Sequence, residues 1–96
     1  MPYAVKFTRT VADKASTLHP DIKKQLRSAI MEISKEPYSG KELQEELSGF
    51  LSYRFMRYRI LYQVNNADKV ITIYIFGHRR DVYELFSELV LSQKNL

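Results

Sequence analysis

The sequence contains no cysteine, and this absence excludes several kinds of chemistry. Without a thiol the chain can form no disulfide bond, carries no cysteine nucleophile and cannot build a zinc site of the usual kind. Its two histidines, His19 and His78, are far apart in the sequence and form no ligand cluster of metal-binding spacing. We therefore expect no metal and no cofactor. The lack of cysteine is also compatible with a cytoplasmic location.

Long apolar runs are absent as well. The N-terminal residues MPYAVKFTR contain none, so no signal peptide is visible, and no stretch approaches the roughly 20 apolar residues of a membrane span. We therefore expect no membrane partner. A length of 96 residues suffices for one modest hydrophobic core, which predicts a single domain over residues 1–96.

Basic residues exceed acidic ones only moderately, with 15 Lys and Arg against 11 Asp and Glu. The resulting formal net charge of +4 does not by itself indicate a nucleic-acid partner. The distribution of charge says more, because residues 50–83 combine a cluster of arginines with interleaved tyrosines. The arginines are Arg54, Arg57, Arg59, Arg79 and Arg80, and the tyrosines are Tyr53, Tyr58, Tyr62, Tyr74 and Tyr83. This clustering suggests a polyanionic partner.

The same stretch has the pattern of β-structure. Residues 58–64 alternate with the period of two expected of a strand, and residues 70–76 are rich in β-branched and aromatic side chains. The residues between them include Asn and Asp, which tolerate turn conformations, so the two runs predict a β-hairpin. Residues 51–55 predict a third strand that folds back through a tight turn near Met56.

This third strand would bring like charges together. If Phe55 opposes Tyr58, then Arg54 opposes Arg59 on the same face of the sheet. Like charges directly across a strand pair repel and cost stability. A sheet that tolerates them either splays both side chains into water or keeps them together for an anion.

The first third of the chain predicts a strand followed by two helices. Residues 3–7 alternate as a short strand, and Thr8 or Thr10 could cap a helix after it. His19 is interpreted as a loop residue without a role, and Pro20 suits the first turn of the second helix. The apolar residues of this helix form a stripe at helical spacing, consisting of Ile22, Leu26, Ala29, Ile30 and Ile33.

The remaining segments complete the predicted fold. Residues 38–49 have no strong pattern and allow only one short helical turn, and Asp81 can cap a last helix. The order is strand, helix, helix, three strands, helix, which predicts an α+β fold. In this fold a short N-terminal strand and a helical hairpin precede a three-stranded antiparallel meander and a C-terminal helix. The helical hairpin covers one face of the sheet.

Several motifs, in this order and spacing, resemble the RelE/ParE superfamily of bacterial and archaeal toxins from type II toxin–antitoxin pairs. The motifs are YAVKF, EPYSGKEL, LSGFLSYRFMRYRILYQV and ITIYIFGHRRDVY, and together they cover nearly the whole chain. The resemblance implies the fold just derived and a cognate antitoxin that wraps the toxin in a hetero-oligomer. RelE-like members cut mRNA in the ribosomal A site without a metal, whereas ParE-like members inhibit DNA gyrase and lack the catalytic set.

The resemblance also implies a set of site residues. RelE-like toxins carry basic residues on the first hairpin strand, an arginine after the tyrosine of the next strand, and another basic residue after the last strand. A tyrosine or histidine near the C-terminus completes the site. Carried onto this sequence, these positions fall on Arg54, Arg59, Arg79 and Tyr83, and His78 matches the histidine of the GHR-type members.

The sequence departs from this pattern in three respects. Some members have two lysines on the first hairpin strand, where this chain has only Arg54. Their hairpin is also longer, and many relatives with a short hairpin have glycine near Met56. The lysine general base of the pattern is therefore missing here.

The chemistry of these residue types fits RNA cleavage. Arginine stays charged and binds phosphate through a planar fork, which suits it to the developing charge on a scissile phosphate. For proton transfer His78 is the better suited residue, since its reference pKa of about 6.5 is near operating pH. Tyr83, with a reference pKa of about 10, is a weaker acid that would need cationic neighbours such as Arg79 and Arg80. Arg57 and Arg80 would assist RNA docking, and an aromatic ring such as that of Tyr53 could stack on a base.

Each residue also has a simpler interpretation. The arginines could solvate an exposed sheet face or bind acidic antitoxin residues, His78 could bond the backbone at a strand end, and Tyr83 could cover the core. Glu45 and Glu46 are alternative general bases on a solvated segment. We predict a ribosome-dependent, metal-independent mRNA endonuclease with the ribosome, mRNA and an antitoxin as partners. The alternatives are a ParE-like gyrase inhibitor that acts by binding and an inactive member that only binds an antitoxin.

Overall fold

The computed structural model describes residues 2–78 and 80–94, and the predicted α+β order is present in them. The elements are β1 (Ala4–Phe7), α1 (Arg9–Ser16), α2 (Pro20–Lys35), β2 (Lys41–Glu42), β3 (Leu51–Phe55), β4 (Tyr58–Asn65), β5 (Val70–His78) and α3 (Val82–Lys94). Single-turn 3-10 helices at Pro37–Ser39 and Glu45–Leu47 flank β2. The segment expected to be a linker therefore contains a strand that the sequence did not predict.

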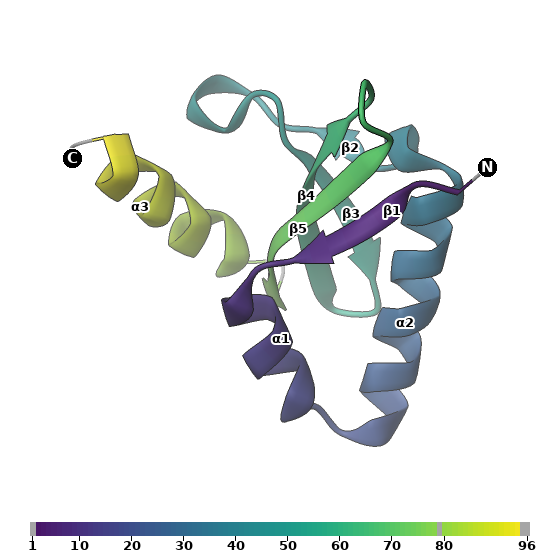
Figure 1. The fold of residues 1–96 in the computed structure, drawn as a ribbon. Coiled ribbons are helices and arrows are strands. Elements are labelled where there is room, and N and C mark those ends of the chain that lie inside the picture. Colours follow the sequence, from purple (N-terminus) through teal and green to yellow (C-terminus); the bar gives the residue numbers. More distant parts are fainter. Residues whose placement is uncertain (1, 79, 95–96) are drawn as a thin grey trace.

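The strands form one mixed sheet in the order β1-β5-β4-β3-β2 (Figure 1). The predicted meander of β3, β4 and β5 is confirmed, and so is its first register, which pairs Arg54 with Arg59 and Phe55 with Tyr58. Two edge strands extend the meander. β2 pairs antiparallel with β3, and β1 pairs parallel with β5.

Different helices cover the two faces of the sheet (Figure 1). α1 and α2 pack on one face, where the buried core consists of Val11, Leu26, Ala29, Ile33, Leu51, Phe55, Ile60, Tyr62, Ile71, Ile73 and Phe76. α3 packs on the other face, with a smaller buried cluster of Leu47, Leu61, Ile75, Val82 and Phe86. Successive residues of a strand point to opposite faces, so neighbours such as Ile60 and Leu61 belong to different clusters. The predicted helical pair on one face is therefore present.

Local capping sets where the helices begin. Thr8 precedes α1, and its Oγ1 accepts a hydrogen bond from the backbone N–H of Val11 at 3.3 Å. His19 is the N-cap of α2, since its Nδ1 accepts from the N–H of Asp21 at 3.2 Å, with Pro20 in the first turn. His19 lies outside the helices, as expected, but it caps α2, a structural contact that the sequence did not indicate. Among the described residues, no helix combines the length and apolar character needed to cross a membrane.

Beyond the end of β1, side chains donate hydrogen bonds to the free backbone carbonyls along the edge of β5. β1 ends at Phe7, so the backbone carbonyls of β5 after Ile73 have no strand partner on that side. The Oγ1 of Thr8 donates to the carbonyl of Tyr74 at 3.0 Å, and the Nζ of Lys14 donates to the carbonyl of Phe76 at 2.8 Å. Buried backbone carbonyls need such partners, so α1 takes over the edge where β1 stops.

Candidate functional site

The hairpin of β3 and β4 holds two arginines side by side. Arg54 lies directly opposite Arg59, and paired residues project from the same face of an antiparallel sheet. The turn between the strands has only two residues, and the first, Met56, has a φ of 52°. Arg54 is exposed and Arg59 is half-buried. The pattern expected from the sequence, two like charges on one face, is therefore realised.

No described carboxylate neutralises this pair. In the part of the chain that the structure describes, the only close approach of a basic nitrogen to a carboxylate joins His19 and Asp21 at 3.8 Å. The Nε of Arg59 is also buried and has no hydrogen-bond partner among these residues. A buried donor without a partner costs roughly 1–3 kcal/mol, and each such group in a native protein calls for an explanation. An anionic ligand on this face is such an explanation.

Tyr83 contributes a phenol to the same face. It lies in the first turn of α3, and its hydroxyl is 2.9 Å from the Oγ of Ser52. Ser52 is 2% exposed and precedes Arg54 by two residues on β3, so both side chains leave the strand on the same face, roughly 7 Å apart along it. The phenol therefore lies on the same face of the sheet as the Arg54–Arg59 pair, beside the strand that carries Arg54.

Sequence reasoning did not identify Ser52. Its partner Tyr83 is 31 residues away on another element, so no local pattern connects them. The one available signal was a small polar residue in a strand that is otherwise apolar, aromatic or basic.

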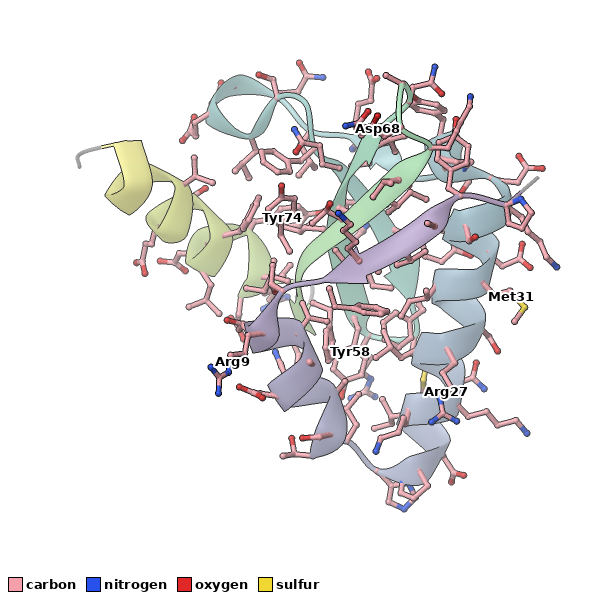
Figure 2. The ribbon with its side chains drawn as sticks, in the orientation of Figure 1. Arg9, Arg27, Met31, Tyr58, Asp68 and Tyr74 are labelled. Carbon is pink, nitrogen blue, oxygen red and sulfur yellow. The ribbon has the colours of Figure 1, made fainter. Side chains whose placement is uncertain are left out.

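His78 lies on the opposite face of the sheet. It pairs with Tyr58 across β4 and β5, and the two ring centroids are 5.1 Å apart. Tyr58 in turn stacks on Phe55 with 5.3 Å between ring centroids, and Figure 2 shows Tyr58 beneath the sheet next to α1. Tyr53 also packs against the core on this side. The structure therefore does not bring His78 or Tyr53 together with Arg54, Arg59 and Tyr83.

Two of the remaining predicted residues lie at one end of the meander. Arg57 is the second residue of the β3–β4 turn and is exposed, and Arg80 is exposed between β5 and α3. Arg79 lies outside the described residues. Glu45 and Glu46 are exposed on the turn Glu45–Leu47. Within residues 2–78 and 80–94, no group of three or more histidine, aspartate and glutamate side chains could hold a metal ion.

A second surface, which we call the helix groove, lies between α1, β1 and α2. It consists of two adjoining hollows of about 330 Å³ and 590 Å³, and both are lined by Phe7, Arg27 and Ile30. Phe7 is 50% exposed, and the lysines Lys23 and Lys35 line the outer ends. Figure 2 shows Arg27 on the lower half of α2. The helix groove is therefore apolar inside and basic at its rim.

The fold and this site define a class of protein. A family model described as "ParE toxin of type II toxin-antitoxin system, parDE" matches residues 4–83. The protein therefore belongs to the RelE/ParE superfamily of type II toxin–antitoxin toxins, as its sequence motifs suggested.

Individual relatives within this superfamily carry the names RelG and RelE. The chain is similar to Toxin RelG of Mycobacterium tuberculosis, with 36% identity over 85 residues, 86% of this chain and 98% of the relative. It resembles a chain of the RelBE2 toxin–antitoxin complex of the same organism, with 34% identity and a TM-score of 0.75, over 82% of this chain and all of that one. The RelE–RelB complex of Pyrococcus horikoshii gives 26% identity and a TM-score of 0.68, over 82% and 97% of the two chains.

Proposed function

We propose that this protein is a toxin that cleaves mRNA on the ribosome without a metal ion and is neutralised by a cognate antitoxin. The observation that supports this most is the Arg54–Arg59 pair, which is held together across two strands, neutralised by no described carboxylate and located on the same face of the sheet as the phenol of Tyr83. Such a pair is costly by itself and favourable with a phosphate between the two side chains. The relationship to RelG and RelE toxins supports the same conclusion.

The proposed reaction is an internal phosphoryl transfer in the RNA. The 2′-hydroxyl gives its proton to solvent water as its oxygen attacks the adjacent phosphorus, the bond from phosphorus to the 5′-oxygen breaks, and that oxygen gains a proton. Arg54 and Arg59 bind the phosphate oxygens as negative charge develops on them. Tyr83 supplies the proton to the leaving oxygen. Arg79 is retained from the family pattern as a further phosphate ligand.

Ser52 is proposed to position Tyr83. Because its Oγ is buried and lies 2.9 Å from the phenol, it fixes the orientation of the ring relative to the arginines. His78, on the opposite face, is expected to contribute less to proton transfer than Tyr83.

Gyrase inhibition is the second candidate. The matching family model carries the ParE name, and β3 contains no lysine. In that case the arginines would form a binding surface and no covalent step would take place.

Induction of the toxin in growing cells separates the two functions. We expect primer extension on a translated message to detect cuts inside codons. Relaxed plasmid DNA together with intact mRNA would instead show that gyrase is the target. Intact mRNA with normal plasmid topology would show an inactive chain that only binds an antitoxin.

Single-turnover cleavage on saturated ribosomes tests the site residues, because saturation hides binding defects and leaves chemical ones. We expect Arg59→Ala and Tyr83→Phe to be slower by about 10²–10³-fold. Ser52→Ala should be slowed less than Tyr83→Phe, because it releases the phenol without removing it. Arg57→Ala, at the hairpin turn, is the matched control and should recover the wild-type rate. Full recovery of all four variants would show that the arginines only dock the RNA.

A further inference from the structure

A lysine from α1 reaches the edge of β5 at Phe76 and Gly77. The Nζ of Lys14 donates to the carbonyl of Phe76 at 2.8 Å and lies 5.1 Å from the centroid of the Phe76 ring. The next residue is Gly77, and a Cβ placed on it would lie only 3.1 Å from the same Nζ. The ammonium group therefore occupies space at the β5 edge that a side chain at position 77 would share.

Gly77 lies on β5 between this ammonium, at the outer edge of the strand, and Arg59 on the neighbouring β4. It lies directly opposite Arg59 on β4, so its missing side chain would project from the face that carries Arg59. A Cβ on Gly77 would also lie 3.7 Å from the Cβ of Val82, the residue before Tyr83. Lys14, Arg59 and the start of α3 thus converge around one glycine.

Like the two arginines, Lys14 forms no ion pair with a carboxylate among the described residues. An ammonium has three N–H donors, and the carbonyl of Phe76 takes one of them. The lysine as a whole is exposed. Lys14 adds a cation at the outer edge of β5, one strand away from Arg59 on β4 and two from Arg54 on β3, and an anion bound on this end of the sheet would reduce their mutual repulsion.

We propose that Lys14 is an additional phosphate-binding residue of this site, supplied by α1 rather than by the hairpin. The inference rests on the proposed RNA cleavage and extends it. The ammonium binds an oxygen of the RNA backbone while the Phe76 carbonyl holds it in place. Because Gly77 has no side chain, the RNA backbone can approach the ammonium group of Lys14.

The competing explanation is structural, because Lys14 could serve only to satisfy the Phe76 carbonyl at the sheet edge. Two substitutions separate these roles. Lys14→Gln removes the charge but keeps an N–H donor for the carbonyl, whereas Lys14→Arg keeps the charge. Lys24→Met is the control for net charge, since Lys24 is exposed on α2, away from the site.

The test measures binding of the full-length toxin to ribosomes carrying an mRNA whose A-site codon is blocked by 2′-O-methylation. Affinities are determined between about 50 and 200 mM salt, where each phosphate contact to single-stranded RNA contributes about 0.7 to the slope of log K against log salt. We expect Lys14→Gln to lower the slope by about 0.7 and to weaken low-salt binding about tenfold or more. Lys14→Arg and Lys24→Met should keep the wild-type slope.

A Lys14→Gln protein with the wild-type slope would overturn the inference, even if its stability toward urea has changed. The proposed function is judged separately, by cleavage of the unmodified message with the wild-type toxin. Wild-type cleavage combined with an unchanged Lys14→Gln slope refutes only the role of Lys14. Absence of wild-type cleavage refutes the proposed function and the role of Lys14 with it.

Discussion

Among single residues, Tyr62 combines a fully buried ring with a hydroxyl group that needs hydrogen-bond partners. It is fully buried in β4, and its hydroxyl donates to the carbonyl of Pro37 at 2.7 Å and accepts from the N–H of Gly40 at 3.1 Å. Burial raises the pKa of Tyr62 above its ordinary value of 10.0, and the hydrogen bond from Gly40 opposes that shift. A Cβ on Gly40 would lie 2.5 Å from this hydroxyl, so glycine is required there for close approach.

This raised pKa predicts a loss of stability in alkali. The unfolded state releases the Tyr62 proton near pH 10, before the folded state does, so the contribution of this group is intact below about pH 10. It decreases as the pH rises from there through the folded-state pKa. We expect Tyr62→Phe to lack this alkaline loss of stability. At pH 7 the variant should be destabilised by about 1–3 kcal/mol, because the Pro37 carbonyl and the Gly40 N–H lose their hydrogen-bond partner.

Urea unfolding between pH 7 and pH 11 measures both effects. Tyr38→Phe is the matched control, since Tyr38 is 58% exposed and should behave like the wild type. If the free energy of unfolding of Tyr62→Phe fell in alkali as much as that of the wild type, Tyr62 would not be the cause of the loss.

Among the elements, the β3–β4 hairpin decides the geometry of the site. Its turn places Met56 at a φ of 52°, in the left-handed region that costs a residue other than glycine roughly 1–2 kcal/mol. Met56 is also 55% exposed, so its side chain recovers little of this cost by burial. The chain nevertheless keeps the two-residue turn that sets Arg54 opposite Arg59.

Met56→Gly should therefore stabilise the protein by about 1 kcal/mol without changing the register. Thermal or urea unfolding gives the stability, and single-turnover cleavage checks that the arginine pair is intact. Arg57→Gly is the control, because Arg57 does not have a positive φ and glycine there should destabilise by roughly 0.5–1 kcal/mol. Equal effects of the two substitutions would show that backbone strain at Met56 is not the cause.

At the scale of the whole molecule, the proposed RNA site and the proposed antitoxin site lie at different faces of the sheet. Arg54, Arg59 and Tyr83 lie on the face that α3 covers, whereas the helix groove lies beside α1 and α2. The relatives from M. tuberculosis and P. horikoshii were solved as toxin–antitoxin complexes. We propose that the antitoxin of this protein places an acidic segment with apolar anchors in the helix groove, because the groove is apolar with a basic rim.

Arg27→Glu reverses the charge at the shared wall of the helix groove. We expect it to weaken binding of the antitoxin encoded beside the toxin by tenfold or more and to leave ribosomal cleavage unchanged. Arg9→Glu makes the same charge change on α1, where Figure 2 shows Arg9 pointing away from the molecule, and should bind normally. Calorimetric titration with the purified antitoxin distinguishes them, and equal weakening would mean that only net charge matters.

Local sequence patterns predicted the main helices and strands and the arginine pair. The period of two through residues 58–64 and a two-residue turn leave one register for β3 and β4, and this register places Arg54 opposite Arg59. The helical stripe and Pro20 likewise located α2. The family motifs then supplied Tyr83, but not the serine that holds it.

Contacts between distant segments determine which of these side chains meet. Ser52 and Tyr83 are 31 residues apart, and Lys14 and Phe76 are 62 apart, so no local pattern encodes either contact. The place of β1 next to β5 is equally non-local. His78 lies across the sheet from the arginines because the β4–β5 register pairs it with Tyr58, and a shift of one residue would have reversed its face. Short-range periodicity therefore predicts what each strand presents, whereas only the packing of distant segments determines which side chains form a site.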